Sequence, residues 1–439
     1  MNRLEFDLKK TCGKIKAMHA VNNGPRKKRK KQSISNFDAY KEAKIPYARL
    51  HDTAYWTAIG GCHLVDVNNI FTDFSKDPYD PASYDFFLTD IYIENIVNAG
   101  TEVFYRLGAT IEHWEKKYNV IPPEDPKKWA VICEHIIAHY TQGWADGFNF
   151  KIEYWEIWNE PDTPDNDSTW TGTKEQFFEL YEIAATHLKN RFPNLKIGGP
   201  AISQSAFGDL TWAGEFVEYM AKRNIPLDFF SWHIYTYTTD ENLRMANGVR
   251  EILDKNGYTE TESIVSEWNY IKDWEENYIY SIQQIIGIKG AAFECAMMCT
   301  SQNSSIDMLM YYDARPSGFN GLFDPDTAQP IKGYYPIKMF STLYELGTQV
   351  ECKSDMKDIY ALGATDGKKS AFMIARYEDD DCITDEKEIT VSIPELQNVS
   401  LNCFWVDKDI NEEVENILTD ENGSFKLKMK PNSFTLLSL

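Results

Sequence analysis

Two glutamates, each in an aromatic and polar setting, are the side chains of this sequence best suited to do chemistry together. Glu160 lies in the run Glu-Ile-Trp-Asn-Glu-Pro, and Glu267 lies in the run Ser-Glu-Trp-Asn. Cleavage of a glycosidic bond requires such a pair, because one carboxyl group protonates the departing oxygen while the other attacks the anomeric carbon or activates a water molecule. The pair therefore predicts acid–base chemistry at a sugar linkage, if the fold brings both side chains together.

Eight short apolar or β-rich runs alternate with helical stretches before residue 347. The predicted strands are 15–22, 45–52, 102–108, 154–160, 196–202, 228–235, 263–270 and 307–313. The predicted helices are 84–99, 129–141, 177–191, 210–223, 242–256, 277–300 and 335–346. Eight such alternations without a large break favour a closed (β/α)₈ TIM barrel over an open sheet. We therefore expect an α/β fold with a catalytic barrel over residues 14–346.

The chain after residue 347 has a different pattern, in which short β-rich runs are separated by Asp, Gly, Asn and Pro. The predicted strands there are 359–364, 370–376, 388–393, 400–407, 425–430 and 433–439. At the other end of the chain, Leu4, Phe6 and Leu8 alternate with charged residues, as in a strand with one buried face. We expect an appended all-β sandwich domain over 347–439, completed by an N-terminal strand from 1–13.

Reacting groups of a TIM barrel lie at the C-terminal ends of its strands. Glu160 ends the fourth predicted strand and Glu267 lies on the seventh, so the two would face each other across the barrel mouth. The other polar side chains at these strand ends are Arg49, His51, Asp52, Asn159, His233, Tyr235, Asp313 and Arg315. They are the candidates for contact with a substrate.

The motifs around the two glutamates resemble the acid/base and nucleophile motifs of the clan A glycoside hydrolases. The rest of the chain is most similar to family 39, which holds β-xylosidases and α-L-iduronidases. The supporting segments are Tyr-Ala-Arg-Leu-His at 47–51, Lys-Ile-Gly-Gly-Pro at 196–200 and Ser-Trp-His-Ile-Tyr at 231–235. Asn-Glu-Pro on a fourth strand, followed by Ser-Glu-Trp on the seventh, is a specific combination.

This resemblance implies a double displacement with retention, in which Glu160 is the acid/base and Glu267 the nucleophile, with the carboxyl groups about 5–5.5 Å apart. It implies that Asn159 holds the sugar 2-hydroxyl and that Arg49 hydrogen-bonds the nucleophile. The other residues that it places in the sugar subsite are His51, His233, Tyr235, Trp268 and Asp313. Simpler interpretations stay open: an internal ion pair for Arg49, a core histidine for His233, packing for Tyr235 and an exposed loop acid for Asp313.

One segment departs from the pattern of the β-xylosidases, in which His51 is usually followed by Gly and an aromatic–acidic loop. Here the chain continues with Asp52-Thr-Ala-Tyr-Trp. Because this loop contributes to the sugar subsite, xylose specificity does not carry over, and the sugar could be xylose, arabinose, galactose, mannose or a uronic acid. We expect exo-acting, β-xylosidase-like cleavage of short oligosaccharides. The alternatives are a transglycosylase and a non-catalytic carbohydrate-binding barrel.

The charge of the chain limits the classes of partner that it could bind. The net charge of −22 argues against a nucleic-acid partner, because phosphate would be repelled. The basic run 26–31 is most simply a solvated loop, although it could attract an anionic sugar.

No stretch approaches the roughly 18 apolar residues of a membrane span, and no apolar leader is evident. The eight cysteines form no CxxC pair. We expect a cytoplasmic protein that needs no cofactor or metal and binds an oligosaccharide or small glycoside. The oligomeric state stays open.

Overall fold

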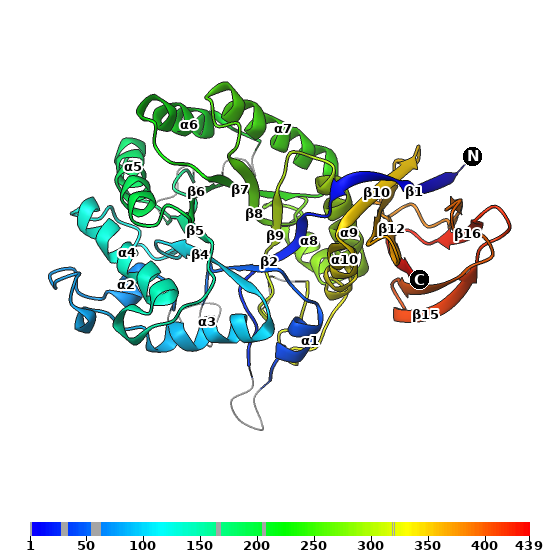
Figure 1. Ribbon diagram of the computed structural model, residues 1–439, viewed down its shortest axis with the longest axis horizontal. Helices are drawn as coiled ribbons and strands as arrows, with labels where there is room; N and C mark the ends of the chain where they lie inside the picture. The colour runs from blue at the N-terminus through cyan, green and yellow to red at the C-terminus, as the bar shows by residue number, and fades with distance from the viewer. Residues whose placement is uncertain are drawn as a thin grey trace.

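The computed structural model of the chain describes residues 2–27, 34–53, 63–163, 168–203, 208–317, 319 and 321–439. Residues 28–31 of the basic run lie outside this part of the chain. The described residues form a barrel with a β-rich lobe beside it, and both chain ends lie in that lobe (Figure 1). Among the described residues, no helix combines the length and apolar character needed to cross a lipid bilayer.

Eight parallel strands close the barrel in sequence order, which confirms the predicted (β/α)₈ fold class. They are β2 (Ala17–Asn22), β3 (Tyr47–Arg49), β4 (Glu102–Leu107), β5 (Tyr154–Ile157), β6 (Lys196–Ile202), β7 (Phe229–Thr236), β8 (Glu262–Tyr270) and β9 (Met308–Tyr311). The helices are α1 (Phe37–Glu42), α2 (Val67–Ile70), α3 (Phe87–Ala99), α4 (Pro126–Gln142), α5 (Lys174–Arg191), α6 (Thr211–Arg223), α7 (Thr239–Lys255), α8 (Tyr278–Ile285), α9 (Ile288–Gln302) and α10 (Tyr334–Leu346), with 3₁₀ turns at Pro81–Ser83 and Trp144–Asp146.

The lower part of the barrel interior is filled by apolar side chains. Phe104 of β4 meets Phe229 of β7 at 5.2 Å between ring centroids, which is possible only inside a closed barrel because these strands are not neighbours. Alternate residues of each strand face outward, onto the surrounding helices. On β5, Tyr154 belongs to the same apolar cluster, and the next inward-facing residue, Glu156, is charged and fully buried. The interior therefore changes from apolar to charged toward the C-terminal ends of the strands.

Nine strands form a second sheet in the order β15-β14-β17-β12-β11-β10-β1-β13-β16. They are β1 (Arg3–Lys14), β10 (Thr348–Ser354), β11 (Ile359–Thr365), β12 (Ser370–Arg376), β13 (Lys387–Ser392), β14 (Ser400–Val406), β15 (Asn411–Leu418), β16 (Ser424–Met429) and β17 (Ser433–Ser438). The N-terminal strand β1 thus pairs with β10 and β13. Residues from strands far apart in this order share one core, for example Phe6, Ile389, Leu401 and Leu437. The sheet therefore folds over on itself as a sandwich does.

Strand β12 joins the lobe to the barrel because both of its faces are buried. Phe372 and Ile374 point into the core of the lobe, whereas Ala371, Met373 and Ala375 belong to the main core of the barrel. The second set packs against α9 and α10. A strand with two buried faces has no polar alternation, which explains the continuous apolar run of β12.

Some predicted elements differ from those of the structure. The predicted helix 277–300 is two helices, α8 and α9, separated at Gly287, which stands before α9 with an extended ψ of −176°. Strands β10 and β15 were not predicted. Strand β15 is mostly exposed and rich in Glu and Asn, so it lacks the apolar alternation that identifies a strand. A capping box formed by Thr173 and Gln176 begins α5, within three residues of the predicted start.

Candidate active site

The chain leaves the barrel wall abruptly after β5. The strand ends at Ile157, three residues earlier than predicted, because Trp158 and Glu160 have left-handed backbones with φ of 75° and 49°. Non-glycine residues seldom adopt this conformation, and such strain is concentrated at functional sites. The indole of Trp158 donates to the carbonyl of Thr169 at 2.8 Å, which anchors the turn. Asn159 and Glu160 are thereby placed beyond the end of the strand, at the barrel mouth.

A bulge in β8 positions the second glutamate. Trp232 of β7 pairs with Val265, but His233 pairs with Glu267, so Ser266 is an extra residue on β8. A bulge of this kind re-aims the side chains that follow it. The next pairs along the two strands include Tyr235, whose hydroxyl donates to Oε2 of Glu267 at 2.7 Å.

Arg49, at the end of β3, is fully buried and hydrogen-bonded at each of its three nitrogens. Its Nε donates to Glu156 at 2.6 Å, one Nη donates to Glu267 at 2.7 Å and to Asn22 at 3.1 Å, and the other donates to Asn159 at 2.6 Å. A planar guanidinium suits this task, since it directs several donors in fixed directions. Arg49 therefore sets the orientation of the Glu267 carboxylate and of the Asn159 amide at once.

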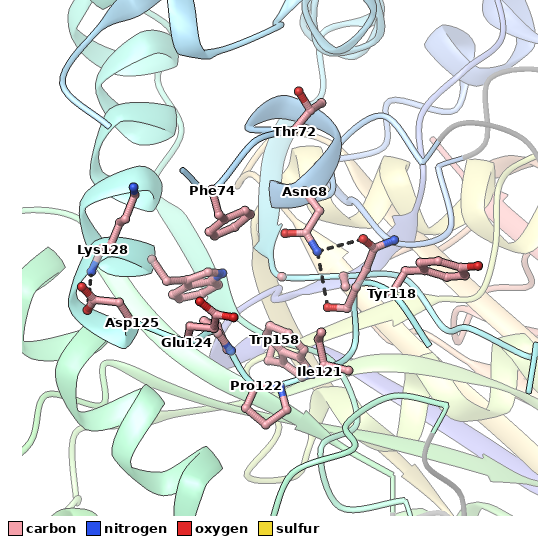
Figure 2. Close-up of a pocket in the computed structure, with 15 residues that line it drawn as sticks. Asn68, Thr72, Phe74, Tyr118, Ile121, Pro122, Glu124, Asp125, Lys128 and Trp158 are labelled. Atoms are coloured by element: carbon pink, nitrogen blue, oxygen red, sulfur yellow. Dashed lines mark hydrogen bonds between the residues drawn. The ribbon is translucent and has the colours of Figure 1, made fainter. Parts of the chain in front are cut away.

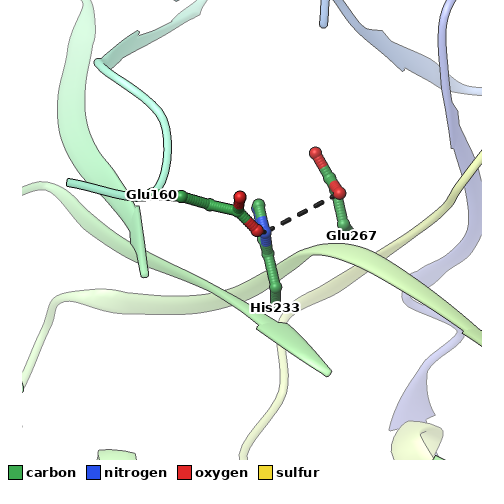
Figure 3. Close-up of side chains that lie close together, drawn as sticks. All are labelled: Glu160, His233 and Glu267. Atoms are coloured by element: carbon green, nitrogen blue, oxygen red, sulfur yellow. Dashed lines mark hydrogen bonds and ion pairs between the residues drawn. The ribbon is translucent and has the colours of Figure 1, made fainter. Parts of the chain in front are cut away.

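Glu160, His233 and Glu267 come together at the centre of the mouth (Figure 3). His233 Nδ1 lies 2.7 Å from Oε1 of Glu160 and 3.7 Å from Oε2 of Glu267. One ligating atom from each of the three residues lies within 4.8 Å of the others, so the two glutamate carboxyls are close neighbours. The same three groups could also hold a metal ion, and the expectation of no metal stays a prediction.

Burial and charge act differently on the two carboxyl groups. Burial raises the pKa of Glu160 to about 7, while Arg49 opposes the rise and Asp52 adds to it. Burial also raises the pKa of Glu267, and His233, Arg49 and the Tyr235 hydroxyl oppose this rise. The direct contact with Arg49 is a charge-assisted hydrogen bond that only the ionised Glu267 makes in full. Glu160 is thus the group better suited to hold a proton near neutral pH.

The remaining predicted binding residues mostly surround this pair. His51 is buried with Nε2 3.8 Å from Oε1 of Glu267, and burial lowers its pKa well below the usual value, so the imidazole is neutral. Burial also lowers the pKa of His233, to about 4. Asn159 accepts from Arg49 through Oδ1, while its buried Nδ2 has no hydrogen-bond partner among the described residues. That amide is therefore a donor available to a ligand.

Trp268 corrects the sequence interpretation, because it does not face the mouth. It is fully buried, and its ring packs against Phe293 of α9 at 6.3 Å and against Tyr311 at 5.4 Å. Neighbouring residues on a strand point to opposite faces, so a side chain next to Glu267 must point outward, toward the helices. Trp268 supports β8 and is not in a position to stack on a sugar.

Asp313 is also placed differently from an exposed loop acid. It is fully buried beyond the end of β9, where its Oδ2 accepts from Arg315 Nε at 2.6 Å and from Asn23 at 3.1 Å. Its Oδ1 accepts from the backbone N–H of Arg315 at 3.1 Å. Both oxygens are engaged within the protein, so Asp313 fixes the position of Arg315 instead of presenting a free carboxylate to a substrate.

Comparison with known proteins decides the family. A family model described as glycosyl hydrolases family 39 matches residues 39–289, which is more than half of the chain. The chain belongs to glycosyl hydrolase family 39.

Two proteins of known name are similar to this family 39 chain in sequence, and one solved structure is similar to it in fold. A β-xylosidase of Caldicellulosiruptor saccharolyticus is 29% identical over 178 residues, which cover 37% of this chain and 34% of that protein. A β-xylosidase of Geobacillus stearothermophilus is 29% identical over 186 residues, 39% of this chain and 35% of that protein. A glucosidase structure from Croceicoccus marinus has a TM-score of 0.82 at 22% identity, covering 100% of this chain and 98% of that one. The matched region spans about a third of each curated relative's length, and the structural likeness shows the shared fold.

Sequence reasoning missed two side chains that hold the centre of this family 39 site. Glu156, inside the same motif as Glu160, is the main anionic partner of Arg49. Asn22, the last residue of β2, accepts from Arg49 and donates to the carbonyls of Ser266 and Met310. Glu156 could have been found, since the alternation of faces along the predicted strand 154–160 places it on the same side as Glu160. Asn22 gave no signal beyond its place at a strand end.

A further cavity of about 500 Å³ lies beside the same region of the family 39 barrel (Figure 2). Phe74, Ile121, Trp129 and Trp158 supply apolar surface, and Asn68 is among its polar lining residues. Because Trp158 precedes the Asn-Glu-Pro turn, one wall of this cavity is continuous with the turn that places Glu160. Neither glutamate of the central pair lines it.

Proposed function

We propose that this chain is a retaining, exo-acting glycoside hydrolase that cleaves a short oligosaccharide or small glycoside by double displacement. The observation that carries the proposal is the close approach of Glu160 and Glu267 beside His233, with one atom from each group within 4.8 Å of the others. An upper limit of 4.8 Å between these atoms fits the roughly 5–5.5 Å carboxyl separation of retaining enzymes better than the roughly 6.5–9.5 Å of inverting enzymes. Exo action is in keeping with the β-xylosidases among the relatives.

In the first step, Glu267 attacks the anomeric carbon while Glu160 donates its proton to the departing glycosidic oxygen. The bond between that oxygen and the anomeric carbon breaks, and an ester forms between the sugar and Glu267. In the second step, Glu160 takes a proton from water, and the water oxygen displaces Glu267. The pKa of about 7 for Glu160 suits both roles. Arg49 and Tyr235 stabilise the carboxylate that leaves at the end.

The free Nδ2 of Asn159 supports its assignment as the donor to the sugar 2-hydroxyl. A hydrogen bond at this hydroxyl strengthens as positive charge develops on the ring in the transition state. Arg49 contributes by holding the Asn159 amide through Oδ1, so that Nδ2 points away from the guanidinium. His51 and His233, both neutral, complete the polar wall of the sugar subsite in this proposal.

A panel of aryl glycosides tests the proposal, with pyranosides and furanosides of both anomeric configurations. We expect release of the phenol from at least one member, which also names the sugar. The Glu160→Gln variant should lose about 10²- to 10⁴-fold with a poor leaving group and much less with a dinitrophenolate, which needs no protonation. Sugars that bind to the wild type without cleavage of any panel member would contradict the proposal and favour a carbohydrate-binding barrel.

The raised pKa of Glu160 predicts a pH profile. The acid form is present below the pKa, so raising the pH through about 7 removes the proton that the leaving oxygen needs. We expect kcat/KM to fall above about pH 7 on a substrate with a poor leaving group. On the same substrate, this limb should be absent from the residual activity of the Glu160→Gln variant. If the variant keeps a limb with the same midpoint, the titrating group is not Glu160.

A further inference from the structure

Asp52, the residue that departs from the β-xylosidase pattern after His51, places a further carboxylate at the mouth beside Glu160 and Glu267. Its backbone is left-handed, with φ of 53°, a conformation for which glycine is the ordinary choice. Its side chain is 23% exposed, compared with 6% for Glu267. A carboxylate with this exposure, next to a buried catalytic group, lies on the solvent side of the site.

The imidazole of His51 lies between the two carboxylates. Its Nε2 is 3.7 Å from Oδ1 of Asp52 and 3.8 Å from Oε1 of Glu267. The Tyr312 hydroxyl donates to Oδ2 of Asp52 at 2.8 Å, which fixes the carboxylate. A sugar ring whose anomeric carbon meets Glu267 and whose edge passes His51 therefore extends toward Oδ1 of Asp52. Carboxylate oxygens are strong acceptors for hydroxyl groups.

Among the described residues, three arginines near this wall are already paired with acids. Arg49 contacts Glu156 and Glu267, Arg106 contacts Asp66, and the half-buried Arg315 contacts Asp313. Arg315 also donates to the Tyr312 hydroxyl at 3.2 Å and to the backbone carbonyl of Asp52. Asp52 thus adds negative charge to a wall whose three described arginines are each paired with another acid. A carboxylate on the sugar would meet repulsion there, in a setting less screened than bulk water.

We propose that Asp52 hydrogen-bonds a hydroxyl of the bound sugar and selects an uncharged sugar over a uronic acid. This inference rests on the proposed function, because it assumes that the ring is held with its anomeric carbon at Glu267. It assigns a specificity-determining role to a residue on the segment that departs from the β-xylosidases.

The kinetic test compares wild type, Asp52→Asn and Asp52→Gly on matched aryl glycosides, such as a glucoside with its glucuronide and a galactoside with its galacturonide. Glycine fits the left-handed backbone, and asparagine keeps the shape of the side chain. A loss that came from misfolding would therefore differ between the two variants, whereas loss of the carboxylate affects both. We expect kcat/KM on the preferred neutral sugar to fall about 10- to 100-fold in both variants, the usual effect of losing a hydrogen bond to a charged group. The ratio of neutral to acidic sugar should fall as well. Asp326→Asn, an exposed acid after β9, is the control and should change neither value.

A binding test separates this inference from the proposed function. Calorimetry with the same glycosides on Glu267→Gln, with and without Asp52→Asn, reports recognition without turnover. Weaker binding of neutral sugars in the double variant, even if the wild type hydrolyses none of them, supports the role of Asp52 while the proposed function fails. Equal binding with and without the Asp52 substitution overturns the inference, as does an unchanged ratio of neutral to acidic sugar. Failure of every sugar to bind overturns both.

Discussion

Glu267→Ala is expected to lose on the order of 10⁴- to 10⁶-fold in kcat on the best aryl glycoside, comparable to the loss of a nucleophile or its partner in other covalent mechanisms. The residual rate cannot pass through a glycosyl–Glu267 ester, because the attacking carboxylate is gone. Glu262 is a matched control on the same strand. It is the first residue of β8, at the opposite end from the mouth, and its contacts are with Tyr154 and Lys196. Glu262→Ala should keep nearly full activity.

Azide identifies the role of each glutamate through the product that it forms. In Glu267→Ala, azide can occupy the space of the lost carboxylate and attack the anomeric carbon once, which gives a glycosyl azide of inverted configuration. In Glu160→Ala, azide attacks the glycosyl–Glu267 ester instead, which gives a glycosyl azide of the original configuration. The measurement is the anomeric coupling of each azide by NMR. Rescue with the same configuration in both variants would contradict the assignment of the two roles.

Arg49→Met should lower the free energy of unfolding by about 3–5 kcal/mol and abolish activity as well. The substitution leaves the fully buried Glu156 without a charged partner, and a lone buried charge is costly. It also removes the donor that keeps Glu267 ionised. Urea unfolding and kcat on one aryl glycoside measure the two effects. Arg49→Lys should recover little activity, because one ammonium cannot replace three nitrogens in fixed directions.

A second substitution separates the two effects of Arg49. Arg49→Met/Glu156→Gln removes the buried charge that lost its partner, so it should regain part of the stability while remaining inactive. Lys44→Met serves as a control, since it breaks an exposed ion pair with Glu345 that should contribute no more than about 1 kcal/mol. An Arg49→Met protein as stable as the wild type would contradict the role of this arginine as the partner of a buried charge.

The barrel could be predicted from sequence because each strand is a short apolar run followed by a helix with its own start and stop signals. The same approach failed where local signals were weak. Gly287 interrupts a continuous apolar pattern, so α8 and α9 read as one helix, and β15 is held mainly by its pairing with β14. Pairing between strands distant from the core depends on tertiary context, which a single sequence does not display.

At the site, residue types and strand ends were enough to find most of the residues that meet at the mouth. Trp268 was misplaced for a reason already present in the sequence, since it adjoins Glu267 on a strand and must face the other way. Glu156 was overlooked although the same alternation puts it on the face of the strand that points inward. The contacts of Asp52 could not be predicted, because Tyr312 and Arg315 reach it from the far end of the barrel sequence. Such contacts depend on the closure of the barrel.

The stereochemistry of the first product tests the central claim most directly. Hydrolysis of the best aryl glycoside is followed by ¹H NMR in the first minutes, before the released sugar interconverts between its anomers. Double displacement through Glu267 predicts that the first sugar released has the same anomeric configuration as the substrate. Release of the opposite anomer would show a single displacement by water, with Glu267 as a base, and would contradict the account.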